Sequence, residues 1–248
     1  MCKSILTFVL GLLWACNLAA NEVDVVSMVQ RADDYRLKES AAKVVSVVQL
    51  YHDGKLEKTN QYDVYVRENR ESLVLFQSAT EAGQKMLMLG DNYWLLMPKS
   101  RRPIRITPMQ KLLGEASVGD ISTLTWSEDY LPSLEGEEPL QREDLSNVET
   151  YRLALKAKTA GASYQAITLW INKADASPVK ADLYLHSGKL AKVAWFSIEG
   201  DRVAEMILLD KIQPLKRTVI EYQSVQPTRL DDKFYNPAYL IQNPVLEH

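Results

Sequence analysis

Apolar and polar residues alternate along most of the chain and predict a protein built mainly of β-strands. Residues 43–51 and 60–67 are rich in Val and Tyr with a period of two, and Asp53-Gly54 between them is typical of a tight hairpin turn. The same pattern predicts strands at 72–77, 84–89, 92–97, 149–158, 164–172, 179–186, 190–198, 202–209 and 216–222. Short turns separate most of them, so we expect an antiparallel meander of about eleven strands.

Helical periodicity is limited to a few segments. Residues 22–35 place apolar side chains at helical intervals and predict an amphipathic helix before the first strand. Residues 109–113 and 127–134 are predicted to form short helices, and the acidic stretch 135–144 to form a loop. A last helical turn is expected within 231–239.

The alternation also predicts how the sheet lies in water. Asp63, Tyr65 and Arg67 alternate with Val64 and Val66, so one face is polar and the other is apolar. Neighbouring strands twist by roughly 20–25°, and a sheet of this many strands therefore curves strongly. We expect a single domain over residues 21–248, mainly β (α+β), whose concave face is apolar.

The first twenty residues differ from the rest. Lys3 precedes an apolar run at 5–15, and small residues follow at 18–20, which predicts a secretory signal peptide over residues 1–20 and export to the periplasm. Two alternatives are a buried N-terminal core helix and a lipobox at 13–16 with acylation of Cys16. Cys2 and Cys16 are the only cysteines, so cleavage after residue 20 leaves no disulfide.

Composition and motifs narrow the function classes. With 46% apolar residues, 25% charged residues and a net charge of −3, the 248-residue chain is a poor candidate for general nucleic-acid binding. His52, His186 and His248 lie near predicted turns or at the end of the chain, without metal-ligand spacing. Because a phosphate-binding glycine loop and a nucleophile elbow are also missing, we expect no enzyme activity, no cofactor and no metal.

The apolar concave face is the candidate ligand site. Residues 86–89 and 93–97 are apolar on both faces, and methionines gather around them, which suits an adaptable lining for an apolar ligand. The alternative is an ordinary filled core. The candidate lining residues are Val45, Val47, Val64, Val66, Met86, Met88, Trp94, Leu96, Met109, Leu153, Trp170, Leu183 and Ile207.

A cluster of cations follows the central predicted hairpin. Lys99, Arg101, Arg102 and Arg105 lie within seven residues, directly after Pro98. Guanidinium groups pair well with phosphate head groups and with acidic partners, so this basic lip is a candidate contact surface. The alternative is a solvated loop on an acidic protein.

Several short motifs together resemble those of the outer-membrane lipoprotein-sorting (LolA-like) proteins. They are Gly90-Asp91-Asn92-Tyr93-Trp94 with Pro98, Arg101 and Arg102, then Val118-Gly119-Asp120, Tyr164, Trp170-Ile171, Pro178, Lys180 and Gly188-Lys189-Leu190. The resemblance implies an incompletely closed antiparallel barrel, plugged by an N-terminal and a mid-chain helix, whose apolar cavity holds acyl chains. Residues 121–125 depart from the family pattern after the Gly-Asp pair and leave the shape of the lid open.

The expected function is that of a monomeric periplasmic carrier. The resemblance implies that it takes lipoprotein acyl chains or other lipids from an inner-membrane transporter, of the ABC or RND/MMPL type, and passes them to an outer-membrane acceptor. One alternative is an accessory subunit of an RND/MMPL-type exporter that handles a glycolipid or a hydrophobic small molecule. The other is a purely structural envelope protein.

Overall fold

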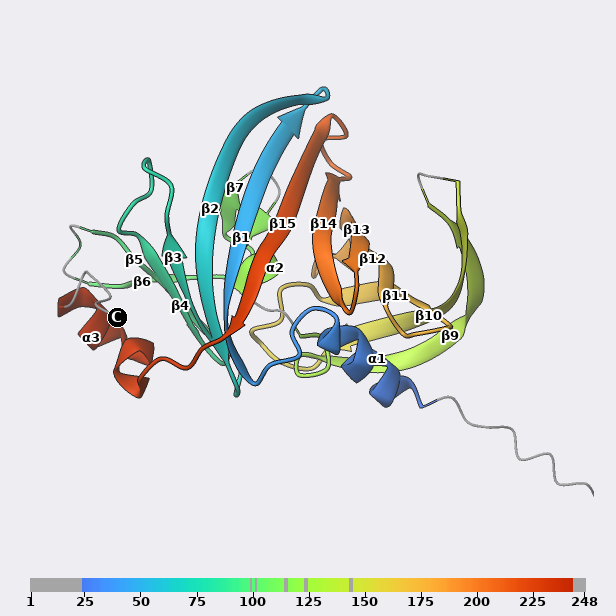
Figure 1. The fold of residues 1–248 in the computed structure, drawn as a ribbon, viewed down its shortest axis with the longest axis horizontal. Helices are drawn as coiled ribbons and strands as arrows, with labels where there is room; N and C mark the ends of the chain where they lie inside the picture. Colours follow the sequence, from blue (N-terminus) through green and yellow to red (C-terminus); the bar gives the residue numbers. More distant parts are fainter. Residues whose placement is uncertain are drawn as a thin grey trace, which may run out of the picture.

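The computed structural model describes residues 24–98, 100, 102–113, 116–122, 125–142 and 145–242. The predicted signal peptide, with Cys16, lies outside these residues. Within them, one long antiparallel sheet bends around a hollow side, as Figure 1 shows.

Thirteen strands form this sheet, in the order β6-β5-β4-β3-β2-β1-β15-β14-β13-β12-β11-β10-β9. Their bounds are β1 (Ala41–His52), β2 (Lys55–Arg67), β3 (Glu71–Phe76), β4 (Lys85–Leu89), β5 (Asn92–Leu96), β6 (Ile104–Ile106), β9 (Tyr130–Gln141), β10 (Asn147–Ala157), β11 (Ala166–Asn172), β12 (Pro178–Tyr184), β13 (Leu190–Glu199), β14 (Arg202–Asp210) and β15 (Lys216–Pro227). A separate two-stranded sheet contains β7 (Lys111–Leu113) and β8 (Ala116–Ser117).

The helices are short. They are α1 (Val25–Asp34), α2 (Val118–Ser122), the 3-10 helix η1 (Asp232–Tyr235) and α3 (Pro237–Gln242). Asp24 caps α1 by accepting a hydrogen bond from the backbone N of Ser27 at 3.1 Å. In the described part of the chain, the helices lack the length and apolar character needed to cross a membrane.

The strand order places the first and last strands side by side in the middle of the sheet. The chain runs outward from β1 to β6, crosses to β9 on the far edge, and returns strand by strand to β15. Since β6 and β9 are the two edges, the sheet does not close. The crossing segment, residues 107–129, carries β7, β8 and α2, and we call its described residues the plug.

Two apolar clusters lie on opposite faces of the sheet. The inner cluster fills the hollow side and combines side chains of α1, the plug and most strands, including Val44, Val64, Leu153 and Leu208. The outer cluster is smaller and covers β2 to β5 on the other face. Its members are Tyr65, Leu73, Leu87, Leu96, Phe234, Tyr235 and Leu240. The outer face therefore owes its cover to η1 and α3, near the end of the chain (Figure 1).

The fold agrees in its main features with the sequence-based predictions. The predicted N-terminal helix and all eleven predicted strands are present, within a few residues of the expected bounds. The main sheet has thirteen strands rather than about eleven, and the predicted incompletely closed barrel is an open curved sheet. Both additional strands, β6 and β9, lie at the edges of the sheet.

Two predictions for the middle of the chain were wrong. Residues 111–113, expected in a helix, form β7, and residues 130–141, expected as a helical turn and a loop, form β9. Pro, Gly and Glu in this stretch disfavour a strand locally. Pairing with β10 over eleven residue pairs outweighs that preference, and an edge strand tolerates proline because one side of it needs no hydrogen-bond donors.

A partly buried ion-pair network, which we call the clasp, joins turns from the two halves of the sheet. Arg70, in the turn after β2, pairs with Asp91 at 2.7 Å and with Asp129 at 2.6 Å. Asp91 also accepts a hydrogen bond from the backbone N of Gly161 at 3.0 Å, and Thr159 donates to Asp129. A Cβ at Gly161 would come within 2.7 Å of the Arg70 guanidinium, so this close approach requires glycine.

We predict that Arg70→Met strongly destabilises the fold. The Asp129 side chain is only 2% exposed, and removal of its cation leaves a buried charge unpaired, which costs about 3–5 kcal/mol. Urea denaturation measures the change. The control is Lys38→Met, because the Lys38–Asp201 pair is 3.8 Å long with side chains 70% and 84% exposed, and such pairs contribute little. Equal, small changes in both variants would show that the clasp does not stabilise the fold.

Candidate functional site

The inner face of the sheet is covered by α1 and by the plug, whose own sheet is the short pair β7 and β8. Ala116, Val118, Ile121 and Trp126 of the plug belong to the inner cluster. The Trp126 ring stands edge-on to Phe196 of β13, with ring centroids 5.7 Å apart. This cover is a short segment that leaves the sheet after β6 and returns to it at β9, so it lies on the inner face without being a strand of the sheet.

A buried polar network attaches the plug to the sheet. Asp120 of α2 forms an ion pair with Lys192 of β13 at 2.7 Å and accepts hydrogen bonds from the Ser117 backbone N at 2.8 Å and from the Tyr164 hydroxyl at 2.8 Å. Burial acts to raise the pKa of Asp120, but Lys192 and Ser117 outweigh burial and hold this pKa below its ordinary value. Asp120 is therefore charged, as its pairing with Lys192 requires.

Close packing at Gly119 supports the same contact. A Cβ at Gly119 would lie 1.8 Å from the hydroxyl oxygen of Ser163, so the approach of α2 to the turn before β11 leaves no room for a side chain. The neighbouring Tyr164 is buried. Burial, and then the charge of Asp120, raise the pKa of Tyr164 well above its ordinary value, so its hydroxyl stays protonated and donates to Asp120.

A second buried carboxylate holds the C-terminal end of the plug. Asp33, at the end of α1, accepts hydrogen bonds from the backbone N of Trp126 at 2.6 Å and of Ser127 at 2.8 Å. Burial raises the pKa of Asp33 to about 6, although these hydrogen bonds act in the opposite direction. Asp33 thus links α1 directly to the part of the plug that carries Trp126.

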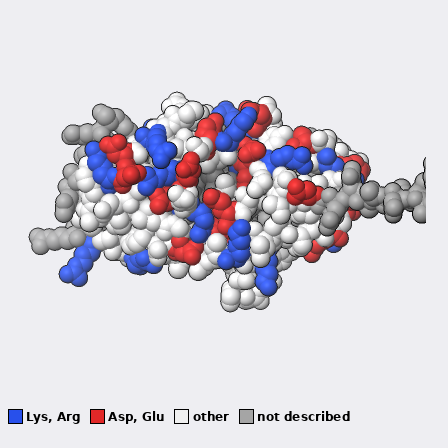
Figure 2. Space-filling view, turned by 90° about the horizontal axis from the view of Figure 1, so that it is seen from below, with Lys and Arg blue, Asp and Glu red and all other residues white. Residues whose placement is uncertain are grey.

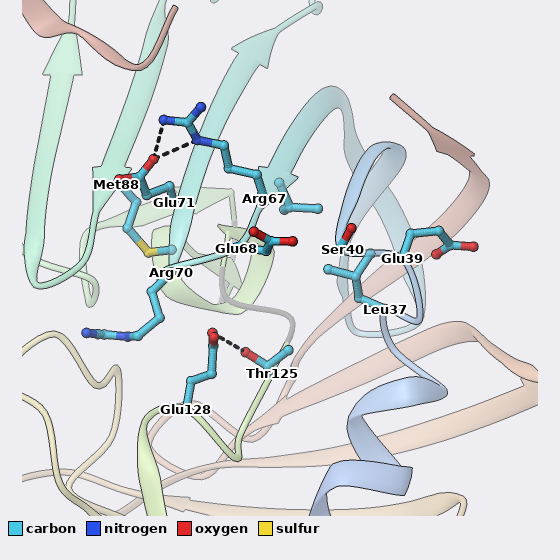
Figure 3. A pocket seen from close by; sticks show the side chains of 11 residues that line it. Leu37, Glu39, Ser40, Arg67, Glu68, Arg70, Glu71, Met88, Thr125 and Glu128 are labelled. Carbon is cyan, nitrogen blue, oxygen red and sulfur yellow. Dashed lines mark hydrogen bonds and ion pairs between the residues drawn. The ribbon is translucent and has the colours of Figure 1, made fainter. Parts of the chain in front are cut away.

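A pocket of about 190 Å³, which we call the mouth pocket, lies beside this end of the plug. Figure 3 shows its side chains converging from the loop between α1 and β1, the turn between β2 and β3, and the segment before β9. Val66 and Met88, both members of the inner cluster, reach it. The complete lining is Leu37, Glu39, Ser40, Val66, Arg67, Glu68, Arg70, Glu71, Met88, Thr125 and Glu128.

Acidic side chains outnumber basic side chains in the lining of the mouth pocket. Arg67 pairs with Glu71 at 2.6 Å and with Asp232 at 2.5 Å, and Arg70 belongs to the clasp. Glu39, Glu68 and Glu128 add negative charge to the same lining. From below, as in Figure 2, basic and acidic side chains are interspersed, and that face carries no extended patch of one sign.

Two further spaces border the plug. A pocket of about 40 Å³, which we call the central pocket, lies among Trp126, Phe196, Leu183 and other members of the inner cluster. A groove of about 500 Å³ opens between Met109 and the ends of β10, β11 and β12, near Tyr164 and Leu185. Ligand pockets usually measure about 300–1,000 Å³, so the groove is large enough for a ligand and the mouth pocket alone is not.

The inner cluster contains about half of the lining residues predicted from the sequence. Val64, Val66, Met86, Met88, Met109, Leu153 and Leu183 belong to this cluster or pack against it. Of these, only Val66, Met88, Met109 and Leu183 border one of the three spaces. Their part in ligand binding stays a prediction.

The other predicted lining residues face elsewhere. Trp94 and Leu96 lie in or against the outer cluster, because they pair with Leu87 and Lys85 and lie beneath the C-terminal segment. Val45, Val47, Trp170 and Ile207 belong to neither cluster. All six lie beside another apolar residue in the sequence, so the period of two does not decide which neighbour points inward.

The predicted basic lip is only partly described, because Lys99 and Arg101 lie outside the described residues. Arg102 and Arg105 are exposed. The Arg105 guanidinium lies 4.8 Å from the centroid of the Trp94 ring and donates to the side chain of Asn92 at 2.5 Å. Arg105 therefore packs on the outer face, away from the mouth pocket. A role for this lip in docking stays a prediction.

Sequence reasoning missed the polar residues that hold the plug. Asp33, Arg70 and Lys192 are ordinary charged residues in the sequence, and their burial follows only from the fold. Asp91, Gly119, Asp120 and Tyr164 were part of the family motifs, which was the one available signal. Among the described residues, no group of three or more His, Cys, Asp or Glu side chains is placed to hold a metal ion.

Comparison with solved structures defines the class of protein. A LolA superfamily protein from Nitrosomonas europaea matches with a TM-score of 0.79 and 28% identity, over 88% of this chain and 100% of that chain. A DUF1329 family protein from Desulfovibrio piger matches with a TM-score of 0.68 and 20% identity, over 86% and 97%. A domain described as an outer membrane lipoprotein-sorting protein, from Vibrio parahaemolyticus, matches with a TM-score of 0.67 and 18% identity, over 87% and 97%.

The chain has a LolA-like fold, which confirms the resemblance seen in the sequence. A family model described as that of an uncharacterized protein matches residues 68–242, more than half of the chain, and the chain belongs to that family. No curated protein matches it in sequence.

We predict that Asp33→Asn changes how stability depends on pH. The pKa of Asp33 is about 6 in the fold against an ordinary 3.8, so the folded state binds the extra proton between these values. The proton bound by Asp33 stabilises the folded state in full below pH 3.8, and this stabilisation is lost as the pH rises through 6. Asparagine keeps a side-chain oxygen as acceptor and carries no charge.

The stability of Asp33→Asn relative to the unchanged protein should therefore rise between pH 4 and pH 7, by at most about 3 kcal/mol. Urea denaturation at several pH values measures this difference, and the other carboxyl groups cancel because both proteins share them. Asp34→Asn, next in sequence and exposed, is the control. Parallel profiles for Asp33→Asn and the unchanged protein would contradict the raised pKa.

Proposed function

We propose that this protein is a carrier that holds the acyl chains of a lipid or lipoprotein against the inner face of its sheet. The observation that supports this most directly is the cover of that face. A large apolar surface, drawn from nearly every strand, is closed by α1 and by the plug, a short segment with one two-stranded sheet and one helix. Buried acids anchor this cover at its middle and near its C-terminal end.

The spaces along the plug supply the second support. The mouth pocket and the 500 Å³ groove lie at its margins, and Met88 and Met109 connect them with the inner cluster. The central pocket measures about 40 Å³, so the inner face is filled by its own side chains in this structure. We infer that cargo enters at a margin of the plug and displaces plug side chains such as Trp126. The adaptable side chains of the methionines assist this displacement.

Burial of one methylene contributes about 0.8 kcal/mol, so a long acyl chain binds strongly when it replaces the plug. The cost of lifting the plug reduces this gain and makes release possible. We propose that the carrier works in the periplasm between an inner-membrane transporter and an outer-membrane acceptor. The LolA superfamily fold and the lipoprotein-sorting description of one structural neighbour support this assignment.

We predict that Leu37→Asp weakens acyl-chain binding. Leu37 is half-buried in the mouth pocket and packs against the inner cluster, so a carboxylate there opposes entry of an apolar chain. Titration with a dansyl-labelled fatty acid should show saturable binding to the unchanged protein and a loss of about tenfold or more in the variant. The measurement is the rise in dansyl fluorescence.

Leu145→Asp is the matched control, because Leu145 is 73% exposed on the hairpin between β9 and β10. It should bind the probe like the unchanged protein, and thermal melting checks that both variants fold. Lipid extraction from gently purified protein tests the natural cargo. A protein that yields no lipid and binds no probe would be a structural envelope protein instead.

A further inference from the structure

Two hairpin tips meet at the end of the molecule opposite α1, as Figure 1 shows. One joins β1 to β2 and the other joins β14 to β15, and a hydrogen bond from the Asp53 backbone N to the Leu215 backbone O, 3.1 Å long, links them. We call residues 52–58 and 210–217 together the tip surface. No part of it borders the mouth pocket, the central pocket or the groove described above.

Three large apolar side chains stand out from the tip surface. Leu56, Ile212 and Leu215 are 53%, 52% and 63% exposed. The turns that carry them are well defined. Asp53 and Gly54 have φ of 50° and 73°, the left-handed geometry of a tight hairpin, and buried Asp210 accepts hydrogen bonds from the backbone N of Ile212 and Gln213. These side chains are therefore held outward by ordered backbone.

Cations surround the three apolar side chains. Lys55, Lys58, Lys211, Lys216 and Arg217 belong to the tip surface, against the acids Asp53, Glu57 and Asp210. Asp210 is only 4% exposed and serves its own turn, and Glu57 lies 3.2 Å from His52. The tip surface is thus locally positive on a chain whose net charge is −3.

Register places the apolar and basic groups on neighbouring strands. Tyr51 of β1 pairs with Leu56 of β2 on one side and with Arg217 of β15 on the other. In the next row, His52 pairs with Lys55 and with Lys216. Apolar side chains are thus flanked by cations at both hairpins. This is the pattern of surfaces that insert a few apolar groups at a bilayer interface while their lysines contact lipid phosphates.

We propose that the tip surface binds peripherally to an anionic lipid bilayer. Leu56, Ile212 and Leu215 enter the head-group region, and the five cations contact the phosphates around them. Pairing of two tip surfaces with each other would bring like charges together, so the positive charge favours anionic lipid over a second copy bound through the same surface. This proposal does not depend on the carrier function, because it concerns a surface at the other end of strands β1 and β2.

Vesicle sedimentation tests the proposal. The protein is purified as the cells process it, with the same N-terminus verified by mass in every variant. The unchanged protein should bind vesicles of phosphatidylglycerol and phosphatidylcholine, less at high salt, and bind vesicles of phosphatidylcholine alone only weakly. The combined variant Leu56→Ser, Ile212→Ser and Leu215→Ser should lose about tenfold or more in partitioning, because each buried apolar side chain contributes.

The control is the combined variant Leu131→Ser, Leu134→Ser and Leu145→Ser. These leucines are also exposed, at 59%, 40% and 73%, but they lie on the β9–β10 hairpin beside acidic residues. This control should bind vesicles like the unchanged protein. The proposal is overturned if the unchanged protein does not bind anionic vesicles, if both triple variants lose binding equally, or if the tip variant merely converts a dimer to a monomer.

Discussion

The open sheet depends on the ion pairs of Arg70 across its hollow side. Because β6 and β9 do not pair, the two halves of the sheet share strand hydrogen bonds only where β1 meets β15. The clasp supplies a second connection, from the β2–β3 and β4–β5 turns to Asp129 and the turn after β10. Burial makes such a pair costly unless it is well bonded, and here each aspartate has a further donor.

The plug is held in a different way from the strands. Its apolar side chains pack on the inner cluster. Asp33 of α1 accepts hydrogen bonds near the C-terminal end of the plug, and Asp120 in its middle forms an ion pair with Lys192 of the sheet. Polar contacts of this kind are directional, so they fix where the plug lies. When the polar contacts of the plug break, the freed polar groups can form hydrogen bonds with water. When its apolar contacts break, they leave apolar surface that an acyl chain would cover. A cover built from both is therefore suited to displacement by an apolar ligand.

Sequence patterns predicted most strands because the majority alternate with a period of two and end at a turn that contains Gly, Asp or Asn. They failed where pairing overrides local preference, as in β9. They also failed to assign faces where both neighbours are apolar, as at Trp94 and Leu96. Those two residues point away from the hollow because a segment nearly 140 residues later covers them, and no local pattern encodes that contact.

The position of the mouth pocket limits what the tip surface can do. β1 has twelve residues, and at about 3.3 Å per residue its length separates the mouth pocket from the tip surface by roughly 40 Å. Under the proposed carrier function, cargo that enters at the mouth pocket does so at the end of β1 remote from the tip surface. A protein resting on a membrane through its tips would instead present the mouth pocket, with Glu39, Glu68 and Glu128, away from the lipid. The two proposals together thus place bilayer contact and cargo entry at opposite ends of β1, and on this view we propose that exchange at the mouth pocket uses a protein partner.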